Sequence, residues 1–176
     1  SRGMGCSVYG AQFLLDGLYN AGAAGYALEL MTATHDRSWW NMIKVGSTIT
    51  MEAWDMKYKP NSDWNHAWGA APANIIPGYL WGIQPALPGY SKAVIKPQPG
   101  HLTYSHISVP TIRGNIVAEF RKDNESLLYI ITFPPNIDCA FGLAGTGDQT
   151  VNLNGMKIRP KDGILQLRQG TNRIEL

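Results

Sequence analysis

The fold is decided where the hydrophobic periodicity changes, at the stretch Pro85-Ala86-Leu87-Pro88-Gly89-Tyr90. Before this stretch, apolar residues recur at steps of three and four, which is typical of amphipathic helices. After it the period is two, as in Ile116, Ala118 and Phe120, which is typical of strands with one buried face. The sequence therefore predicts an α+β chain, helical over 1–90 and built of β-strands over 91–176.

The N-terminal part predicts a helical hairpin. Residues 8–19 carry apolar side chains at helical spacing behind Ser7, a residue type suited to cap a helix. A second helix over 26–34 follows after a short turn, and two helices this close in sequence must run antiparallel. Further helices are predicted at 39–42, behind a capping serine, and at 71–81, where prolines bend the helix.

The C-terminal part predicts an antiparallel β-sandwich of the jelly-roll kind. Turn signals recur at strand-length spacing, among them Arg113-Gly114 and Gly145-Thr146-Gly147, and imply seven or eight short strands. Asn154-Gly155 lies between two short alternating segments. This pair is the strongest signal for a two-residue hairpin in the chain.

Composition excludes several classes of function. The 176 residues carry 15 Lys+Arg against 13 Asp+Glu, a net charge of +2, with no long basic run, so neither nucleic acid nor a membrane is expected as a partner. The four histidines lack metal-ligand spacing, and the two cysteines lie far apart, so neither a metal, a cofactor nor a disulfide is expected. Only 16% of the residues are charged, which suggests that some of the surface is covered by another element.

One segment mixes carboxylates, indoles and an imidazole. It reads Gly-Ser-Thr-Ile-Thr-Met-Glu-Ala-Trp-Asp over 46–55 and Asp-Trp-Asn-His-Ala-Trp-Gly over 63–69. Glycoside hydrolysis needs carboxylates that move protons and flat apolar rings that pack against sugar C–H faces. The alternative is that the tryptophans belong to the core and that Glu52 and Asp55 form a solvated loop edge.

These motifs resemble those of bacterial α-L-rhamnosidases of the inverting (α/α)6-barrel type. Four elements occur in family order: residues 38–55, Trp64-Asn65-His66-Ala67-Trp68-Gly69, Pro88-Gly89-Tyr90 and Ile95-Lys96-Pro97-Gln98-Pro99-Gly100. The resemblance covers essentially the whole chain, although the strands after residue 115 match only as a pattern. It implies the end of the barrel at 1–90 and the family's C-terminal β-domain at 91–176.

The resemblance also implies roles for single residues. Glu52 aligns with the carboxylate that serves as general base in the family, and His66 with the imidazole that contacts the bound rhamnose. Asn65, Trp54 and Trp39 are expected to contact the sugar as well. Asp55 is close to Glu52 in sequence, and a structural hydrogen-bonding role is expected for it rather than that of the general acid.

The sequence departs from the family pattern in two respects. Met51 replaces the tryptophan that usually precedes the glutamate, and Ser47 replaces an alanine, so the sugar pocket is expected to differ. The chain also supplies about four helices, too few for a barrel of six helical hairpins. We therefore expect the C-terminal part of a larger enzyme, with the general acid in an upstream barrel segment, and no activity from this part alone.

The competing class is a non-catalytic carbohydrate-binding or structural module. Few aromatic residues occur in 91–176, which disfavours a sugar-binding sandwich. The expected partners are a rhamnose-containing oligosaccharide or glycoside, the upstream barrel segment, and further copies of the chain through open helix faces. The residues do not indicate a compartment; the resemblance slightly favours a periplasmic or secreted parent protein.

Overall fold

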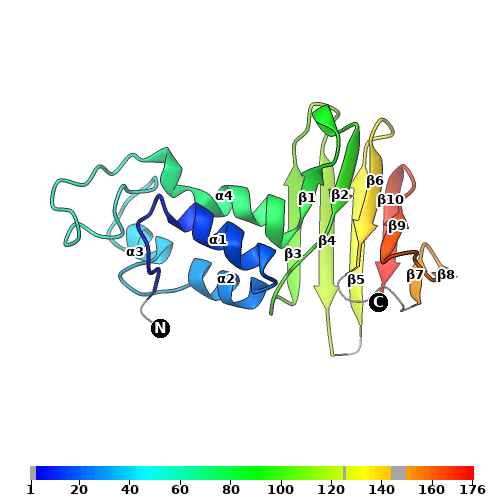
Figure 1. Ribbon diagram of the computed structural model, residues 1–176, viewed down its shortest axis with the longest axis horizontal. Helices are drawn as coiled ribbons and strands as arrows, with labels where there is room; N and C mark the ends of the chain where they lie inside the picture. The colour runs from blue at the N-terminus through cyan, green and yellow to red at the C-terminus, as the bar shows by residue number, and fades with distance from the viewer. Residues whose placement is uncertain (1–2, 125, 144–149) are drawn as a thin grey trace. The chain divides into compact units, whose positions relative to one another are not determined.

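The computed structural model describes residues 3–124, 126–143 and 150–176 (Figure 1). The chain forms two compact units that divide between Ile76 and Pro77. Helices make up the first unit, and strands dominate the second, as the change of periodicity predicts. The first strand begins at Ile83, a few residues before the stretch at which the period changes in the sequence.

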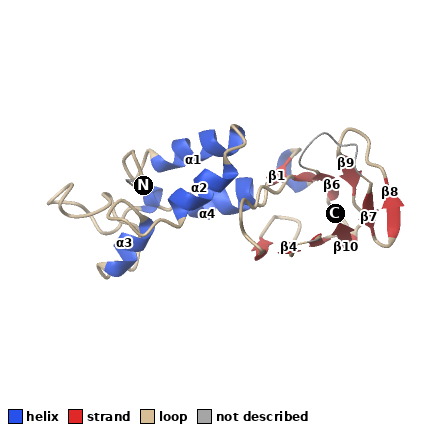
Figure 2. Cartoon of the chain, turned by 90° about the horizontal axis from the view of Figure 1, so that it is seen from below, coloured by secondary structure: helices blue, strands red, loops and turns tan. Residues whose placement is uncertain are grey.

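The first unit is built from short helices joined by long loops. They are α1 (Ala11–Asn20), α2 (Ala24–Met31), α3 (Trp39–Lys44), the 3-10 turn η1 (Ala67–Gly69) and α4 (Ala71–Ile75). Helix α1 contacts both α2 and α4, and Figure 2 shows these three side by side. The predicted hairpin of α1 and α2 is confirmed, because α1 buries Leu15 and Tyr19 and α2 buries Leu28 and Leu30.

Two helix starts can be compared with their predicted caps. Ser38 Oγ accepts a hydrogen bond from the Asn41 N–H (3.1 Å), so it caps α3 as predicted. Ser7 does not cap α1. Its Oγ accepts from the Gly10 N–H (3.1 Å) within a turn that precedes the helix, and α1 begins only at Ala11. Helix α4 continues into a π-helical turn, η2 (Ile76–Leu80), which contains Pro77.

The second unit contains two sheets. One has the strand order β1-β2-β6-β9 and the other the order β3-β4-β5-β10-β7-β8. The strands are β1 (Ile83–Pro85), β2 (Lys92–Ile95), β3 (Tyr104–Val109), β4 (Ile116–Lys122), β5 (Leu127–Phe133), β6 (Asp138–Gly142), β7 (Val151–Leu153), β8 (Met156–Ile158), β9 (Ile164–Gln166) and β10 (Gly170–Glu175); the turn η3 (Pro88–Tyr90) joins β1 to β2. This is the predicted β-sandwich.

One strand pair departs from the prediction that all strands run antiparallel. Strands β2 and β6 pair in parallel, with Lys92 opposite Asp138 and Ile95 opposite Phe141. Parallel neighbours need a crossover connection between them. Strands β3 to β5, which belong to the other sheet, form that crossover, so the chain leaves one sheet and returns to it in the same direction.

Aromatic rings line the core between the two sheets. Trp81, Phe120, Tyr129 and Phe141 form a chain of ring contacts, with centroids 5.3, 5.8 and 5.1 Å apart in that order. Phe120 and Tyr129 lie on β4 and β5, whereas Phe141 lies on β6 of the other sheet. The chain of rings therefore joins the sheets, and alternating burial along β4 supplies its inward-facing residues.

The predicted hairpin at Asn154-Gly155 is confirmed. It joins β7 to β8, with Leu153 opposite Met156. Both turn residues have positive φ, +55° and +85°, as a two-residue type I′ turn requires. The predicted turn at Gly145-Thr146-Gly147 lies outside the described residues.

Exposed apolar side chains are concentrated in the first unit. Twelve of the sixteen large apolar residues that are exposed in the described ranges precede Pro77, among them Phe13, Tyr26 and Trp40. Exposed apolar surface of this kind is typical of an interaction face. Association through it, with an upstream segment or with another copy, stays a prediction. Of the helices that the structure describes, none has the length and apolar character needed to span a membrane.

Candidate functional site

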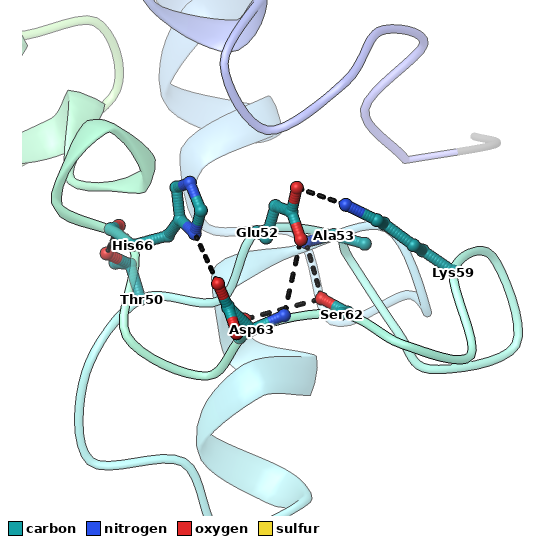
Figure 3. Close-up of polar contacts among 7 residues, drawn as sticks. All are labelled: Thr50, Glu52, Ala53, Lys59, Ser62, Asp63 and His66. Carbon is teal, nitrogen blue, oxygen red and sulfur yellow. Dashed lines mark hydrogen bonds and ion pairs between the residues drawn. The ribbon is translucent and has the colours of Figure 1, made fainter.

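The loop between α3 and η1 folds back on itself and forms the candidate site (Figure 3). Residues 50–53 lie beside residues 62–66. Hydrogen bonds that join the two segments include His66 N–H to Thr50 O (2.8 Å), Glu52 N–H to Asp63 O (2.9 Å) and Ala53 N–H to Ser62 Oγ (3.2 Å). This pairing brings together Glu52 and His66, which the sequence motifs place fourteen positions apart.

Both oxygens of the Glu52 carboxylate have donors. The Lys59 ammonium donates to Oε1, and the Asp63 backbone N–H donates to Oε2 (3.2 Å). These two hydrogen bonds, that of Lys59 first, hold the pKa of Glu52 below its usual value. The side chain is 23% exposed. At neutral pH Glu52 is therefore an oriented, ionised carboxylate that water can still reach.

Lys59 is a contact of Glu52 that the sequence does not single out. Lys57, two positions earlier, has the same chemistry but forms an ion pair with Asp36 instead. Only the fold of the loop determines which of these two lysines reaches the glutamate. Lys59 therefore helps to hold the Glu52 carboxylate in position.

Lys59→Met is expected to raise the pKa of Glu52 towards its ordinary value. The substitution removes the hydrogen bond that contributes most to the lowered pKa, while the hydrogen bond from the Asp63 N–H remains. Carbon-13 NMR titration of the Glu52 carboxyl group in this chain measures the shift directly. Lys57→Met is the matched control, and equal titration of Glu52 in the two variants would contradict the role of Lys59.

His66 and Lys59 lie on opposite sides of Glu52 (Figure 3). Its Nδ1 is buried, has no hydrogen-bond partner among the described residues, and lies 4.0 Å from Asp63 Oδ2. Its ring packs against that of Trp68, with centroids 4.4 Å apart. Asn65 precedes it in the chain and is exposed. The exposed Asn65 can therefore be reached by a ligand, whereas the Nδ1 atom of His66 is covered by the protein.

The two tryptophans expected at the sugar pack against each other. Trp54 is buried and meets the Trp39 ring edge to face, with centroids 5.0 Å apart. Their indole N–H groups donate to backbone carbonyls, that of Trp54 to Cys6 (2.7 Å) and that of Trp39 to Gly69 (2.7 Å). Both rings therefore help to hold the loop in place, and a sugar could contact them only through their apolar surfaces.

Asp55 is tied into the loop by its hydrogen bonds. Its carboxylate accepts from the Lys57 backbone N–H (3.0 Å) and from the side-chain amide of the buried Asn41 (2.8 Å), and these bonds lower its pKa. Asn41 also donates to the Trp54 carbonyl (2.9 Å). A carboxyl group with a lowered pKa is poorly suited to donate a proton, so these contacts favour the structural role.

One set of possible metal ligands occurs within the described residues. Glu52, Asp63 and His66 offer ligand atoms that all lie within 4.8 Å of one another. The spacing of the histidines in the sequence gives no hint of it, because the set contains a single histidine. Both Glu52 oxygens already accept hydrogen bonds, one of them from the Lys59 ammonium. The positive charge beside this carboxylate is therefore already supplied by Lys59.

Comparison with known proteins agrees with this fold. Residues 4–80 match the bacterial alpha-L-rhamnosidase 6 hairpin glycosidase domain, and residues 82–156 match the bacterial alpha-L-rhamnosidase C-terminal domain. An α-L-rhamnosidase of Alteromonas sp. (strain LOR) is 31% identical over 141 residues, which are 75% of this chain and 15% of that protein. The chain belongs to the bacterial α-L-rhamnosidase family.

Solved structures show the same fold. The α-L-rhamnosidase of Dictyoglumus thermophilum superposes with a TM-score of 0.82 at 19% identity, over 96% of this chain and 20% of that one. The Streptomyces avermitilis α-L-rhamnosidase complexed with L-rhamnose gives a TM-score of 0.79 at 22% identity, over 95% of this chain and 17% of that one. The chain thus spans a fifth or less of the length of these relatives.

Proposed function

We propose that this chain is the C-terminal part of a glycoside hydrolase that removes terminal α-L-rhamnose by inverting hydrolysis, and that Glu52 is the general base. The observation that carries the proposal is the state of Glu52: an ionised carboxylate, fixed by Lys59 and Asp63 and open to water. Residues 1–90 would complete the catalytic barrel and residues 91–176 would form the accessory β-domain. Family membership supports both assignments.

Inverting hydrolysis is a single displacement with two carboxyl groups. Glu52 removes a proton from a water molecule while the water oxygen attacks the anomeric carbon, and a protonated carboxylic acid donates its proton to the leaving oxygen. A carboxylate oxygen has two lone pairs, so Glu52 can accept from water while it keeps its bonds to Lys59 and Asp63. The two carboxyl groups must lie about 6.5–9.5 Å apart to leave room for the water.

The general acid is assigned to the barrel segment that this chain does not span. Asp55, the nearest alternative in sequence, has a lowered pKa and is held by Asn41. In the proposed site His66 and Asn65 would donate to or accept from the rhamnose hydroxyl groups, and Trp54 and Trp39 would offer it apolar surface. A lectin-like role of the sandwich is disfavoured, because Tyr104 is the one aromatic residue among the large apolar side chains exposed in the described part of 77–176.

The isolated 176-residue chain is expected not to hydrolyse 4-nitrophenyl α-L-rhamnoside, whereas the full-length parent should do so and release β-rhamnose first. A base without its acid and without the remaining sugar contacts cannot stabilise the oxocarbenium-like transition state. Absorbance of the released nitrophenol and proton NMR of the fresh anomer measure the two results. Turnover by the purified chain that Glu52→Gln abolishes would contradict the division of roles. Initial release of α-rhamnose by the parent would contradict inversion.

A further inference from the structure

A pocket of about 510 Å³ lies on the Lys59 side of Glu52, within the first unit. Its lining includes Glu52, Lys59, Arg37, Tyr58 and Trp54. The volume is within the range of about 300–1,000 Å³ that is usual for small-molecule sites. Of the expected rhamnose contacts, Trp54 lines the pocket, whereas His66, Asn65 and Trp39 do not. The pocket therefore adjoins the proposed base and overlaps the proposed rhamnose contacts only at Trp54.

The charges that line this pocket do not cancel. Glu52 and Lys59 form an ion pair with each other. Arg37 lies over the Tyr58 ring, 4.8 Å from its centroid, and has no carboxylate partner among the described residues. Lys57 also lies over this ring, at 5.2 Å, but it is paired with Asp36 and does not line the pocket. Arg37 is the surplus positive charge of the pocket.

We propose that this pocket binds an anionic sugar residue, one that carries a carboxylate or a sulfate ester, with Arg37 as the counter-ion of its charged group. The placement of that residue next to the terminal rhamnose rests on the proposed function; the anion site itself does not. A planar guanidinium presents paired N–H donors that match carboxylate and sulfate oxygens, and bonds between charged groups are stronger than neutral ones. The parent enzyme would then prefer rhamnose linked to an acidic glycan.

The neighbours of Arg37 suit it to this role. The contact with Tyr58 restricts the guanidinium, so less side-chain entropy is lost when a ligand binds. Lys59 offsets the repulsion that Glu52 would exert on an anion in the same pocket.

The test is a titration of the 176-residue chain with three probes: methyl β-D-glucuronide, the 6-sulfate of methyl β-D-glucoside, and neutral methyl β-D-glucoside. Nitrogen-15 NMR follows the backbone of the pocket and the Arg37 Nε–H. At least one charged probe should bind about 10-fold more tightly than the neutral one, as expected for a single charge-assisted contact. Whichever charged probe binds identifies carboxylate or sulfate as the ligand group.

Arg37→Met is expected to abolish the preference for the charged probe. Lys57→Met removes a neighbouring positive charge that does not line the pocket, and it should change the affinity less than twofold. Equal affinity for charged and neutral probes, or binding that survives Arg37→Met, would overturn the proposal. Glu52→Gln should retain the preference for the charged probe, because the anion site does not require Glu52 to act as a base. The general-base assignment and the anion site can therefore fail independently, and the two experiments distinguish these failures.

Discussion

Replacement of Glu52 by Gln in the full-length parent enzyme should lower kcat by at least about 100-fold, since general-base catalysis contributes about 10²–10⁴-fold. Gln keeps the size of the side chain, but its single carbonyl oxygen can replace only one of the two Glu52 oxygens that accept from Lys59 and from the Asp63 N–H. The amide also cannot take a proton from water. Steady-state kinetics with an aryl α-L-rhamnoside measure the effect. KM should change little, because the lost interaction develops in the transition state.

A matched control separates loss of chemistry from loss of fold in this experiment. Glu29 is an exposed carboxylate on α2, outside the candidate site, and Glu29→Gln should leave kcat unchanged. Equal melting temperatures of the two variants would show that both fold. Activity of Glu52→Gln within about threefold of the unmodified parent would mean that Glu52 is a structural residue and that its assignment as base is wrong.

Gly82→Ala is expected to destabilise the second unit by about 3 kcal/mol, from the combined cost of a left-handed conformation and of overpacking. Gly82 has φ of +61°, and a Cβ atom at this position would lie 2.1 Å from the Lys96 carbonyl oxygen. The backbone cannot easily move away, because the Lys96 N–H donates to the Gly82 carbonyl (3.0 Å). These two residues directly flank the paired strands β1 and β2. Urea unfolding, followed by tyrosine and tryptophan fluorescence, measures the loss.

Gly155→Ala isolates the conformational part of this cost. Gly155 also has positive φ, +85°, but a Cβ atom there would meet nothing within 4 Å. Its replacement should cost only about 1 kcal/mol, the strain of placing a side chain in the left-handed region. Similar losses in the two variants would show that the close approach of Gly82 to Lys96 contributes nothing, contrary to the prediction.

Recognition of the site from the sequence depended on motifs rather than on spacing. Composition and pattern alone left open whether Glu52 and Asp55 belong to a catalytic loop or to a solvated loop edge. Only the family resemblance favoured one of these two interpretations. The contacts then separate the two carboxylates: Glu52 accepts from an ammonium and a backbone N–H, and Asp55 is held within the loop by Asn41. Whether the five expected site residues act on a sugar stays a proposal with stated tests.

The sequence by itself determined the features that depend on neighbours along the chain. The helical hairpin of α1 and α2, the cap at Ser38, the change to strands and the turn at Asn154-Gly155 all follow from local periodicity and backbone preference. Tertiary structure alone decided which distant groups meet. It placed Lys59 rather than Lys57 beside Glu52, and it paired β2 with β6 in parallel. A residue pattern reports which face is buried but not which partner covers it, because that choice depends on packing across the whole unit.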